Sequence, residues 1–266
     1  MYEHRGRIVA CQVCGLARRD PIPAPGDLRA IYSAEDYFQL SSATGIGYRD
    51  YFADATVYRP YFRRKVAILR RYATPPGALL ELGAGAGFAL EAARDAGWDV
   101  HGLELSSGAV AWARQRFGVD VAVGGFDDLR DHECWDVIAA FQTIEHLVDV
   151  RSALRQVREA LRPRGLVFLT SPDHGSLSRK ATRGLWPSYR PEHLVYLDQR
   201  SLRRLLEEEG FHIELIGADD PLLVPLHRLF ERAAHYYLRR RVEPPVIPWC
   251  RVPVWLGDMQ VIARKT

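Results

Sequence analysis

Short apolar runs alternate with longer stretches of mixed polarity along most of this chain. Runs of this kind occupy residues 78–82, 98–104, 119–123, 135–141, 166–170, 211–216 and 255–263. The stretches 88–96, 106–117, 151–161 and 199–209 between them predict helices, with Ser106 or Ser107 capping the second. A continuous apolar run such as 166–170 is typical of a strand buried on both faces. The alternation predicts an α/β fold with a doubly wound sheet.

Two connections in this pattern are unusually long. Residues 162–165 predict only the end of a helix and a turn. By contrast, residues 171–198 separate one strand from the next helix, and residues 221–252 precede the last strand. Connections of such length inside a compact domain are usually functional. We expect both to be insertions that cap a substrate pocket.

A glycine-rich turn follows the strand 78–82. Gly83, Gly85 and Gly87 stand at alternate positions before the helix that begins at Phe88. Glycines at such a turn let a ligand approach the backbone, and the helix N-terminus offers free N–H groups. Phe88 takes the sixth position, where the dinucleotide fingerprint needs glycine or alanine, and no lysine follows as in a phosphate-binding loop. The turn therefore predicts a nucleotide-like cofactor that is not NAD.

Two acidic residues flank this turn. Glu81 lies two positions before Gly83, and Glu104 ends the next strand near the roughly 20-residue spacing at which an acid meets ribose hydroxyls. A carboxylate accepts two hydrogen bonds from a vicinal diol.

In order along the chain, the Glu-x-Gly-x-Gly-x-Gly run, Glu104, the loop 124–128 and the segment 141–147 resemble the motifs of class I S-adenosylmethionine (SAM) dependent methyltransferases. The resemblance implies a Rossmann-like, seven-stranded sheet with an antiparallel last strand, SAM as cofactor, S-adenosylhomocysteine (SAH) as product, and no metal. In this family the loop 124–128 holds the adenine, with Phe126 and Asp127 of the matching types. The implied cofactor-binding residues are Glu81, Gly83, Ala84, Gly85, Gly87, Phe88, Glu104, Leu105, Phe126, Asp127, Phe141 and Gln142.

The first 75 residues are expected to form two smaller units before the SAM-binding domain of residues 76–266. Residues 1–26 contain Cys11-x-x-Cys14-Gly15 and resemble the second knuckle of a zinc ribbon; even with His4 the site lacks a fourth ligand, which favours a remnant without metal. Residues 27–75 resemble a helical lid. Its candidate cofactor contacts are Tyr37, Tyr48 and Tyr51, and the alternative is that these tyrosines only pack the lid on the sheet.

The acceptor is expected beyond the carboxyl ends of the strands, between residues 141–146 and the loop 171–198. His174, Trp186 and Tyr189 are its candidate contacts, although the aromatic pair could equally be loop core. Methyl transfer needs in-line positioning, and a base helps a hydroxyl or amine acceptor. His146 is the first candidate base and His193 the second, but His146 could only orient the loop. A metal at Asp173–His174 or Glu192–His193 is disfavoured by ligand count.

Composition and charge add limits. The net charge of +3 is too small to demand an anionic partner, and the four cysteines do not describe a disulfide scaffold. Without a leader or an apolar run near 18 residues, we expect a cytoplasmic protein with no integral membrane segment. A basic stripe on one helix predicts a solvated positive face, made of Arg151, Arg155, Arg158 and Arg162. Residues 222–241 predict a helix that packs on its own domain or, second, forms a homodimer face.

The pattern favours a methyltransferase acting on a small-molecule acceptor with an oxygen, nitrogen or carbon nucleophile, in bacterial specialised or cell-surface biosynthesis. Methylation of RNA or protein is the second interpretation. It is disfavoured because the segment after residue 141 lacks an Asn/Asp-Pro-Pro-aromatic motif and no basic, aromatic nucleic-acid platform is present. A SAM-binding protein without methyl transfer is the third.

Overall fold

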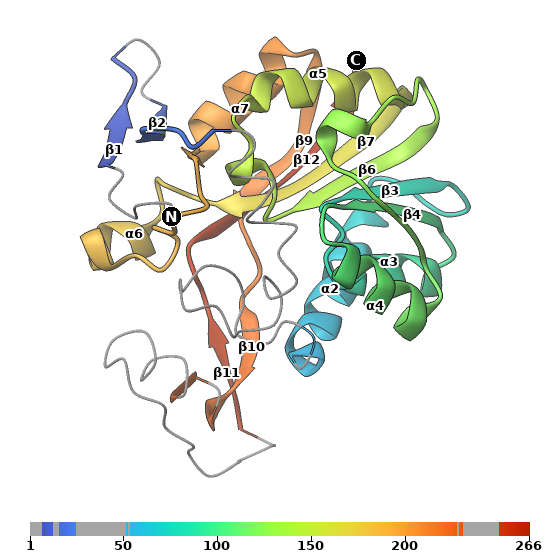
Figure 1. Cartoon of the computed structure of the whole chain (residues 1–266), viewed down its shortest axis with the longest axis horizontal. Helices are drawn as coiled ribbons and strands as arrows, with labels where there is room; N and C mark the ends of the chain where they lie inside the picture. Colours follow the sequence, from blue (N-terminus) through green and yellow to red (C-terminus); the bar gives the residue numbers. More distant parts are fainter. Residues whose placement is uncertain (1–6, 13–15, 25–51, 53, 228, 231–249) are drawn as a thin grey trace.

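The computed structural model describes residues 7–12, 16–24, 52, 54–227, 229–230 and 250–266 (Figure 1). Its centre is a seven-stranded sheet with the strand order β5-β4-β3-β6-β7-β12-β9. Only β12 runs antiparallel to its neighbours, β7 and β9, within this sheet as described. The predicted fold class is therefore confirmed. The strands are β3 (Ala78–Leu82), β4 (Asp99–Glu104), β5 (Asp120–Val123), β6 (Trp135–Phe141), β7 (Leu161–Pro172), β9 (Phe211–Ala218) and β12 (Asp258–Lys265).

Helices cover both faces of this sheet, as a doubly wound fold requires. The helices are α2 (Ala55–Leu69), α3 (Phe88–Asp95), α4 (Ser107–Phe117), α5 (Val150–Ala160) and α7 (Gln199–Glu208). Figure 1 shows α2, α3 and α4 on one side and α5 and α7 on the other. Two apolar cores follow from this arrangement: one holds Leu154 of α5 and Leu202 of α7, and the other holds Val66 of α2 and Leu90 of α3.

Local sequence signals explain where these helices begin. The Ser106 hydroxyl accepts the N–H of Ala109 at 3.3 Å, as predicted for an N-cap. Asp149 and Asp198 cap α5 and α7 in the same way, by accepting the N–H groups of Ser152 and Ser201. Helix α4 ends where Gly118 takes a left-handed conformation with φ of 64°.

Two small sheets stand outside the central one. The hairpin β1 (Arg7–Ala10) and β2 (Ala17–Asp20) pairs with β8 (Val195–Tyr196), so the N-terminal segment joins the insertion 171–198. The same insertion carries α6 (Leu177–Thr182) and the short helix η3 (Arg183–Leu185). Strands β10 (Leu222–Pro225) and β11 (Arg251–Val254) form the second small sheet.

The predicted turn at residues 162–165 is wrong. Strand β7 begins at Leu161, and its register with β6 shifts between the pairs Trp135–Leu161 and Val137–Leu166. The intervening residues form an irregularity within the strand, in which Arg164 has φ of 65°. The last strand likewise begins at Asp258, three residues later than its pattern predicts.

Two other expectations need correction. Residues 222–225 form a strand rather than the start of the predicted helix; residues 226–227 and 229–230 are helical, and residues 231–249 lie outside the described residues. The arginine stripe is not an open positive face, because acids on neighbouring elements neutralise it. Arg151 and Arg155 both pair with Glu209 at the end of α7, and Arg162 pairs with Asp136 at 2.5 Å.

Candidate active site

The glycine turn lies at the point where the sheet reverses its winding. Strand β3 pairs with β4 on one side and with β6 on the other, and ligands of open α/β sheets bind at such a point. Gly83, Gly85 and Gly87 have φ of 76°, 51° and 74°, a region that residues with a Cβ rarely adopt. A Cβ on Gly83 would lie 2.7 Å from the side chain of Thr143. The turn therefore packs directly against the segment that follows β6.

Glu104 connects this turn to the start of α4. Its carboxylate oxygens accept the N–H of Gly85 at 2.8 Å and the N–H of Ser106 at 2.9 Å. Burial raises the pKa of Glu104, and these backbone hydrogen bonds oppose the rise. A carboxylate has about four lone-pair positions, so two accepted bonds leave capacity for a diol.

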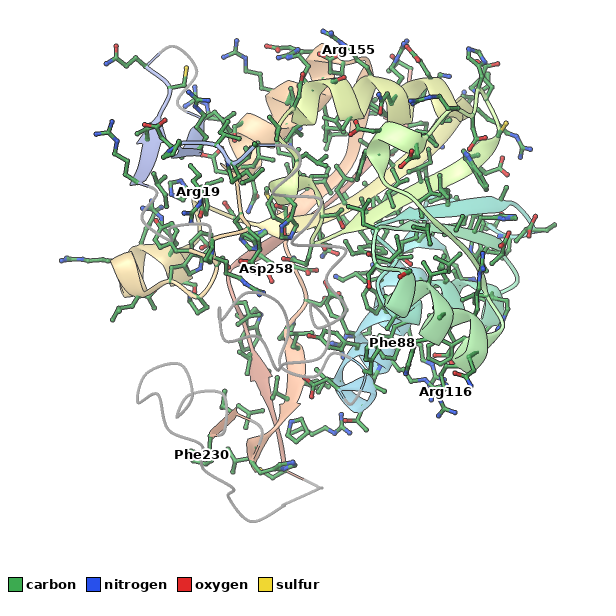
Figure 2. The ribbon with its side chains drawn as sticks, in the orientation of Figure 1. Arg19, Phe88, Arg116, Arg155, Phe230 and Asp258 are labelled. Atoms are coloured by element: carbon green, nitrogen blue, oxygen red, sulfur yellow. The ribbon has the colours of Figure 1, made fainter. Side chains whose placement is uncertain are left out.

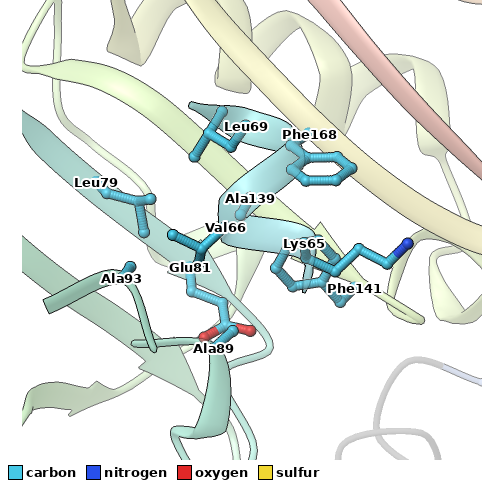
Figure 3. A pocket seen from close by; sticks show the side chains of 10 residues that line it. All are labelled: Lys65, Val66, Leu69, Leu79, Glu81, Ala89, Ala93, Ala139, Phe141 and Phe168. Carbon is cyan, nitrogen blue, oxygen red and sulfur yellow. The ribbon is translucent and has the colours of Figure 1, made fainter. Parts of the chain in front are cut away.

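Glu81 is buried at the base of the turn, with 3% of its surface exposed. Figure 3 shows its carboxylate beside Ala89 of α3, in a small enclosed cavity that Lys65 and Phe141 also line. Burial, and then the neighbouring charge of Glu104, hold the pKa of Glu81 well above its usual range. Its Oε2 atom has no hydrogen-bond partner, which is rare for a buried polar atom. An ammonium group at this position would satisfy it, so the residues fit the amino-acid end of SAM.

The aromatic residues of the predicted cofactor site are mostly packed inward. Phe88 is 1% exposed and contacts Tyr58, Trp112 and Phe117 at centroid distances of 5.6–5.9 Å. Phe126 is buried in the core, whereas Asp127 is exposed. A Cβ on Gly125 would lie 3.2 Å from Leu105, so this leucine covers the start of the predicted adenine loop.

The end of β6 carries local backbone strain. Gln142 has φ of 53°, and its N–H donates to the carbonyl of Thr170 at 2.9 Å. The amide nitrogen of its side chain is buried without a partner. Phe141 packs edge-on against Phe168 of β7 at 5.1 Å. Strained residues of this kind cluster at functional sites, which agrees with the predicted place of Phe141 and Gln142 beside the cofactor.

The structure brings His146 and His193 together. His146 ends the short helix η2 (Ile144–His146), and its ring meets the ring of His193 edge to face, with 4.8 Å between centroids. The N–H of Leu194 donates to the carbonyl of Glu145 at 2.8 Å, which fixes the loop against the end of β6. Burial lowers the pKa of His146 to about 4 and that of His193 well below its usual value. Both imidazoles are therefore neutral near pH 7.

Glu145 completes this group. One of its oxygens accepts the hydroxyl of Ser171 at 3.1 Å and the other has no partner, and burial raises its pKa to about 8. Glu145, His146 and His193 each place one ligand atom within 4.8 Å of the others. The group can share protons or hold a cation. Asp173 belongs to another network, because it accepts the N–H of Gly175 at 2.8 Å and the amide of Gln199 at 2.9 Å.

The other predicted acceptor contacts gather elsewhere in the insertion. The Tyr189 hydroxyl lies 3.3 Å from Nε2 of His174, and both rings contact Tyr196 of β8. Trp186 is completely buried, and its Nε1 donates to the carbonyl of Leu256 at 3.1 Å. The observed contacts of Trp186 are those of a core residue, so no acceptor role is proposed for it.

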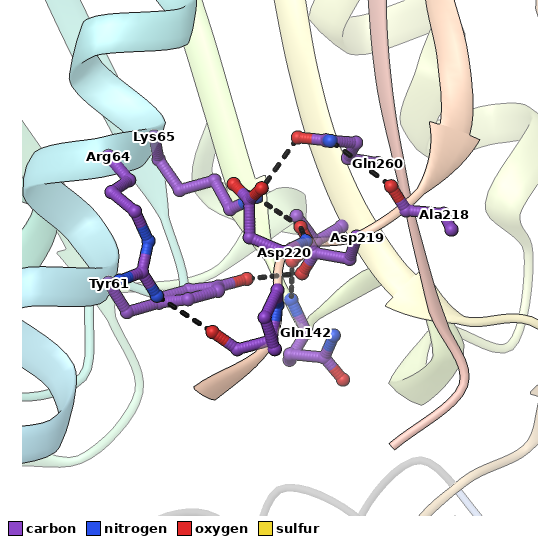
Figure 4. A network of polar contacts seen from close by, with 10 residues as sticks. Tyr61, Arg64, Lys65, Gln142, Ala218, Asp219, Asp220 and Gln260 are labelled. Carbon is purple, nitrogen blue, oxygen red and sulfur yellow. Dashed lines mark hydrogen bonds and ion pairs between the residues drawn. The ribbon is translucent and has the colours of Figure 1, made fainter. Parts of the chain in front are cut away.

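Sequence reasoning missed a buried charge network at the same sheet edge. Lys65 of α2 is 1% exposed; it pairs with Asp219 and with Asp220 at 2.9 Å, and donates to Gln260 at 3.0 Å (Figure 4). The Tyr61 hydroxyl donates to Asp219 at 2.5 Å. Lys65 is one of only three lysines in an arginine-rich chain, and that rarity was the available signal.

Three predicted cofactor contacts, Tyr37, Tyr48 and Tyr51, lie outside the described residues, as does Cys14. Cys11 is exposed at the end of β1. Among the described residues, no helix is long and apolar enough to cross a membrane.

Residues 55–216 match the family described as a methyltransferase domain. The chain belongs to this family. The glycine turn and both acids fall inside the match.

Similar proteins agree with this membership. The "Probable S-adenosylmethionine-dependent methyltransferase" of Mycolicibacterium smegmatis is 30% identical over 158 residues, which are 58% of this chain and 60% of the relative. The ubiquinone biosynthesis O-methyltransferase of Bradyrhizobium diazoefficiens is 26% identical over 98 residues, 35% of this chain and 39% of its own length. The matches thus span about three fifths or less of these relatives. A SAM-dependent methyltransferase of Thermotoga maritima shares the fold, with a TM-score of 0.54 and 18% identity over 81% of this chain and 93% of that structure.

Proposed function

We propose that this protein transfers the methyl group of SAM to a small-molecule acceptor. The observation that carries the proposal is the contact between Gly83 and Thr143, which sets the predicted cofactor turn beside the segment bearing Glu145 and His146. Cofactor groups and proton-transfer groups thus meet at one edge of the sheet. One of the similar proteins is an O-methyltransferase of ubiquinone biosynthesis, which supports a small-molecule acceptor.

SAM, when bound, supplies a methyl carbon activated by its sulfonium. The buried Oε2 of Glu81 would receive the ammonium group, and Glu104 the ribose hydroxyls. His146 approaches the carbonyl of Glu192 with Nδ1, at 3.0 Å. A neutral imidazole can accept a proton from an acceptor hydroxyl or amine at whichever ring nitrogen carries no proton. The ring of His193 packs edge to face against it.

The first test is the variant His146→Ala, with His146→Gln as the matched control for ring loss. We expect turnover with labelled SAM to fall about 100-fold or more, the usual scale of general acid–base catalysis, while SAH affinity in calorimetry stays within about twofold. An equal loss of turnover and SAH affinity would make His146 structural. SAH binding by the wild-type protein is measured first, because calorimetry with SAH needs no methyl acceptor.

We further propose that the reaction needs no metal, that the protein acts in the cytoplasm, and that any self-association is as a homodimer. Dialysis against a chelator should leave turnover unchanged. Lost turnover that zinc or magnesium restores would instead assign Glu145, His146 and His193 to a metal site. Light scattering would settle the oligomeric state.

A further inference from the structure

A cleft of about 550 Å³ lies between the N-terminal hairpin and α6, apart from the glycine turn. Four cationic side chains line most of it: Arg19, Arg179, Lys180 and Arg183. Tyr189 and Ile8 line it as well. No acidic residue lines it among the described residues. Nearby acids are already paired, Asp20 with Arg7 at 3.4 Å and Glu192 with Arg190 at 2.5 Å. The cleft therefore concentrates positive potential.

Arg19 gives this cleft a buried, fixed positive charge. Its side chain is fixed on β2, is only 5% exposed, and donates through Nη2 to the carbonyl of Arg190 at 2.9 Å. Its other terminal nitrogen, Nη1, is also buried, and its guanidinium interacts with the hydroxyl of Tyr196. The guanidinium keeps its charge when buried, and no acidic side chain lines the cleft beside it among the described residues. Its charge therefore adds to the positive potential that an anion in the cleft would meet.

The remaining cations are placed to surround such an anion. Arg179 is held by the bond from its Nε to the carbonyl of His174 at 2.8 Å. Lys180 follows it on α6, and Arg183 begins η3; both are exposed. A buried guanidinium with exposed cations around it suits a phosphate group better than a single carboxylate, because phosphate offers more acceptor oxygens and more charge.

We propose that this cleft binds the phosphate or diphosphate group of a phosphorylated small molecule, which is the methyl acceptor. This step rests on the proposed function. Arg19 also approaches the carbonyl of His193 with Nε at 3.5 Å, and Tyr189 of the cleft contacts His174. The phosphate end would thus lie on the far side of the loop whose His193 meets His146. The cleft selects the acceptor by charge, and the histidine pair meets its reacting end.

The test is calorimetric titration of the full chain with pyrophosphate. Lys180→Glu and Arg183→Glu lie on the exposed rim, where substitution leaves the core intact, and each should weaken binding about tenfold, the scale of one charged hydrogen bond. Added salt should weaken wild-type binding as well. The matched control is Arg116→Glu on α4, an exposed arginine on the opposite side of the molecule from Arg19 (Figure 2). No binding by the wild type, or equal loss in the control, would overturn the proposal.

Two further arms separate the alternatives. Vesicles containing phosphatidic acid test a lipid source of the phosphate, and binding to vesicles without binding to pyrophosphate would overturn the small-molecule assignment. SAH titration of the same variants should give wild-type affinity. If the wild type fails to bind SAH, the proposed function fails, whereas the pyrophosphate series still decides whether the cleft is an anion site.

Discussion

At the residue scale, the buried acids at the strand ends define what this protein can do. Glu81, Glu104 and Glu145 all have raised pKa values because burial penalises their charged forms. Glu81 and Glu145 each keep one oxygen without a partner. Core packing alone would favour apolar residues at such positions. These acids therefore mark places where a ligand or a proton is expected.

The pH dependence of stability tests the environment of Glu145. Its folded pKa is about 8, above its unfolded value, so its contribution to stability is fully present below about pH 4.5 and is lost as the pH rises to about 8. Titration of His146 changes the stability only below about pH 6.5, because its folded pKa is lowered to about 4. In that range the stability falls as the pH falls. From pH 6.5 to 8.5 we expect the wild type to lose about 2 kcal/mol of unfolding free energy relative to Glu145→Gln.

Urea titrations of both proteins at pH 6.5, 7.5 and 8.5 measure this difference. Glutamine keeps an acceptor for the Ser171 hydroxyl, so the comparison removes the titration and little else. Asp258, whose burial raises its pKa to about 7, is present in both proteins, so only its charge interaction with Glu145 differs between them. Parallel curves for the two proteins would show that Glu145 is ionised at neutral pH in the folded state.

At the element scale, the Lys65 network fastens α2 to the central sheet. Lys65 joins α2 to Asp219 after β9 and to Gln260 of β12. The variant Lys65→Met would leave Asp219 buried without its cation, and we expect it to lower the unfolding free energy by about 3–5 kcal/mol. The double variant Lys65→Met/Asp219→Asn should recover most of that loss. Arg203→Met, which breaks an exposed pair with Glu207, should cost less than about 1 kcal/mol. A small loss in Lys65→Met, comparable to that control, would count against the network.

The elements that sequence alone predicted well are those whose pattern is local. Strand 135–141 was predicted at its observed bounds, because its central residues form a continuous apolar run that is buried. The closeness of Glu81 and Glu104 could be predicted from their spacing, because adjacent parallel strands end at the same edge of the sheet. The arginine stripe on α5 was misjudged, because its partners lie some fifty residues away on α7. The irregularity at residues 162–165 depends on pairing with β6, and Arg19 depends on pairing of β2 with β8. No local pattern carries such contacts.

At the scale of the whole molecule, cofactor binding should stabilise the sheet as one unit. The glycine turn, Glu104 and the segment after β6 belong to three adjacent strands, so a ligand that contacts them resists global unfolding. At a hundredfold excess over its Kd, SAH should add about 2.7 kcal/mol to the unfolding free energy. For a chain of this size, that corresponds to a rise in Tm of roughly 5–10 °C.

A thermal-shift series checks this prediction. At the same SAH concentration, Glu104→Ala should reduce the stabilisation free energy that SAH adds by about 1.4 kcal/mol. The loss of a charged hydrogen bond is expected to weaken SAH binding about tenfold. NAD should not displace SAH from the glycine turn, because Phe88 fills the position where a dinucleotide turn packs closely, with 1% of its surface exposed. Displacement of SAH by NAD would contradict the assignment of the turn to SAM. A full shift in Glu104→Ala would move the ribose away from Glu104 and leave the fold assignment intact.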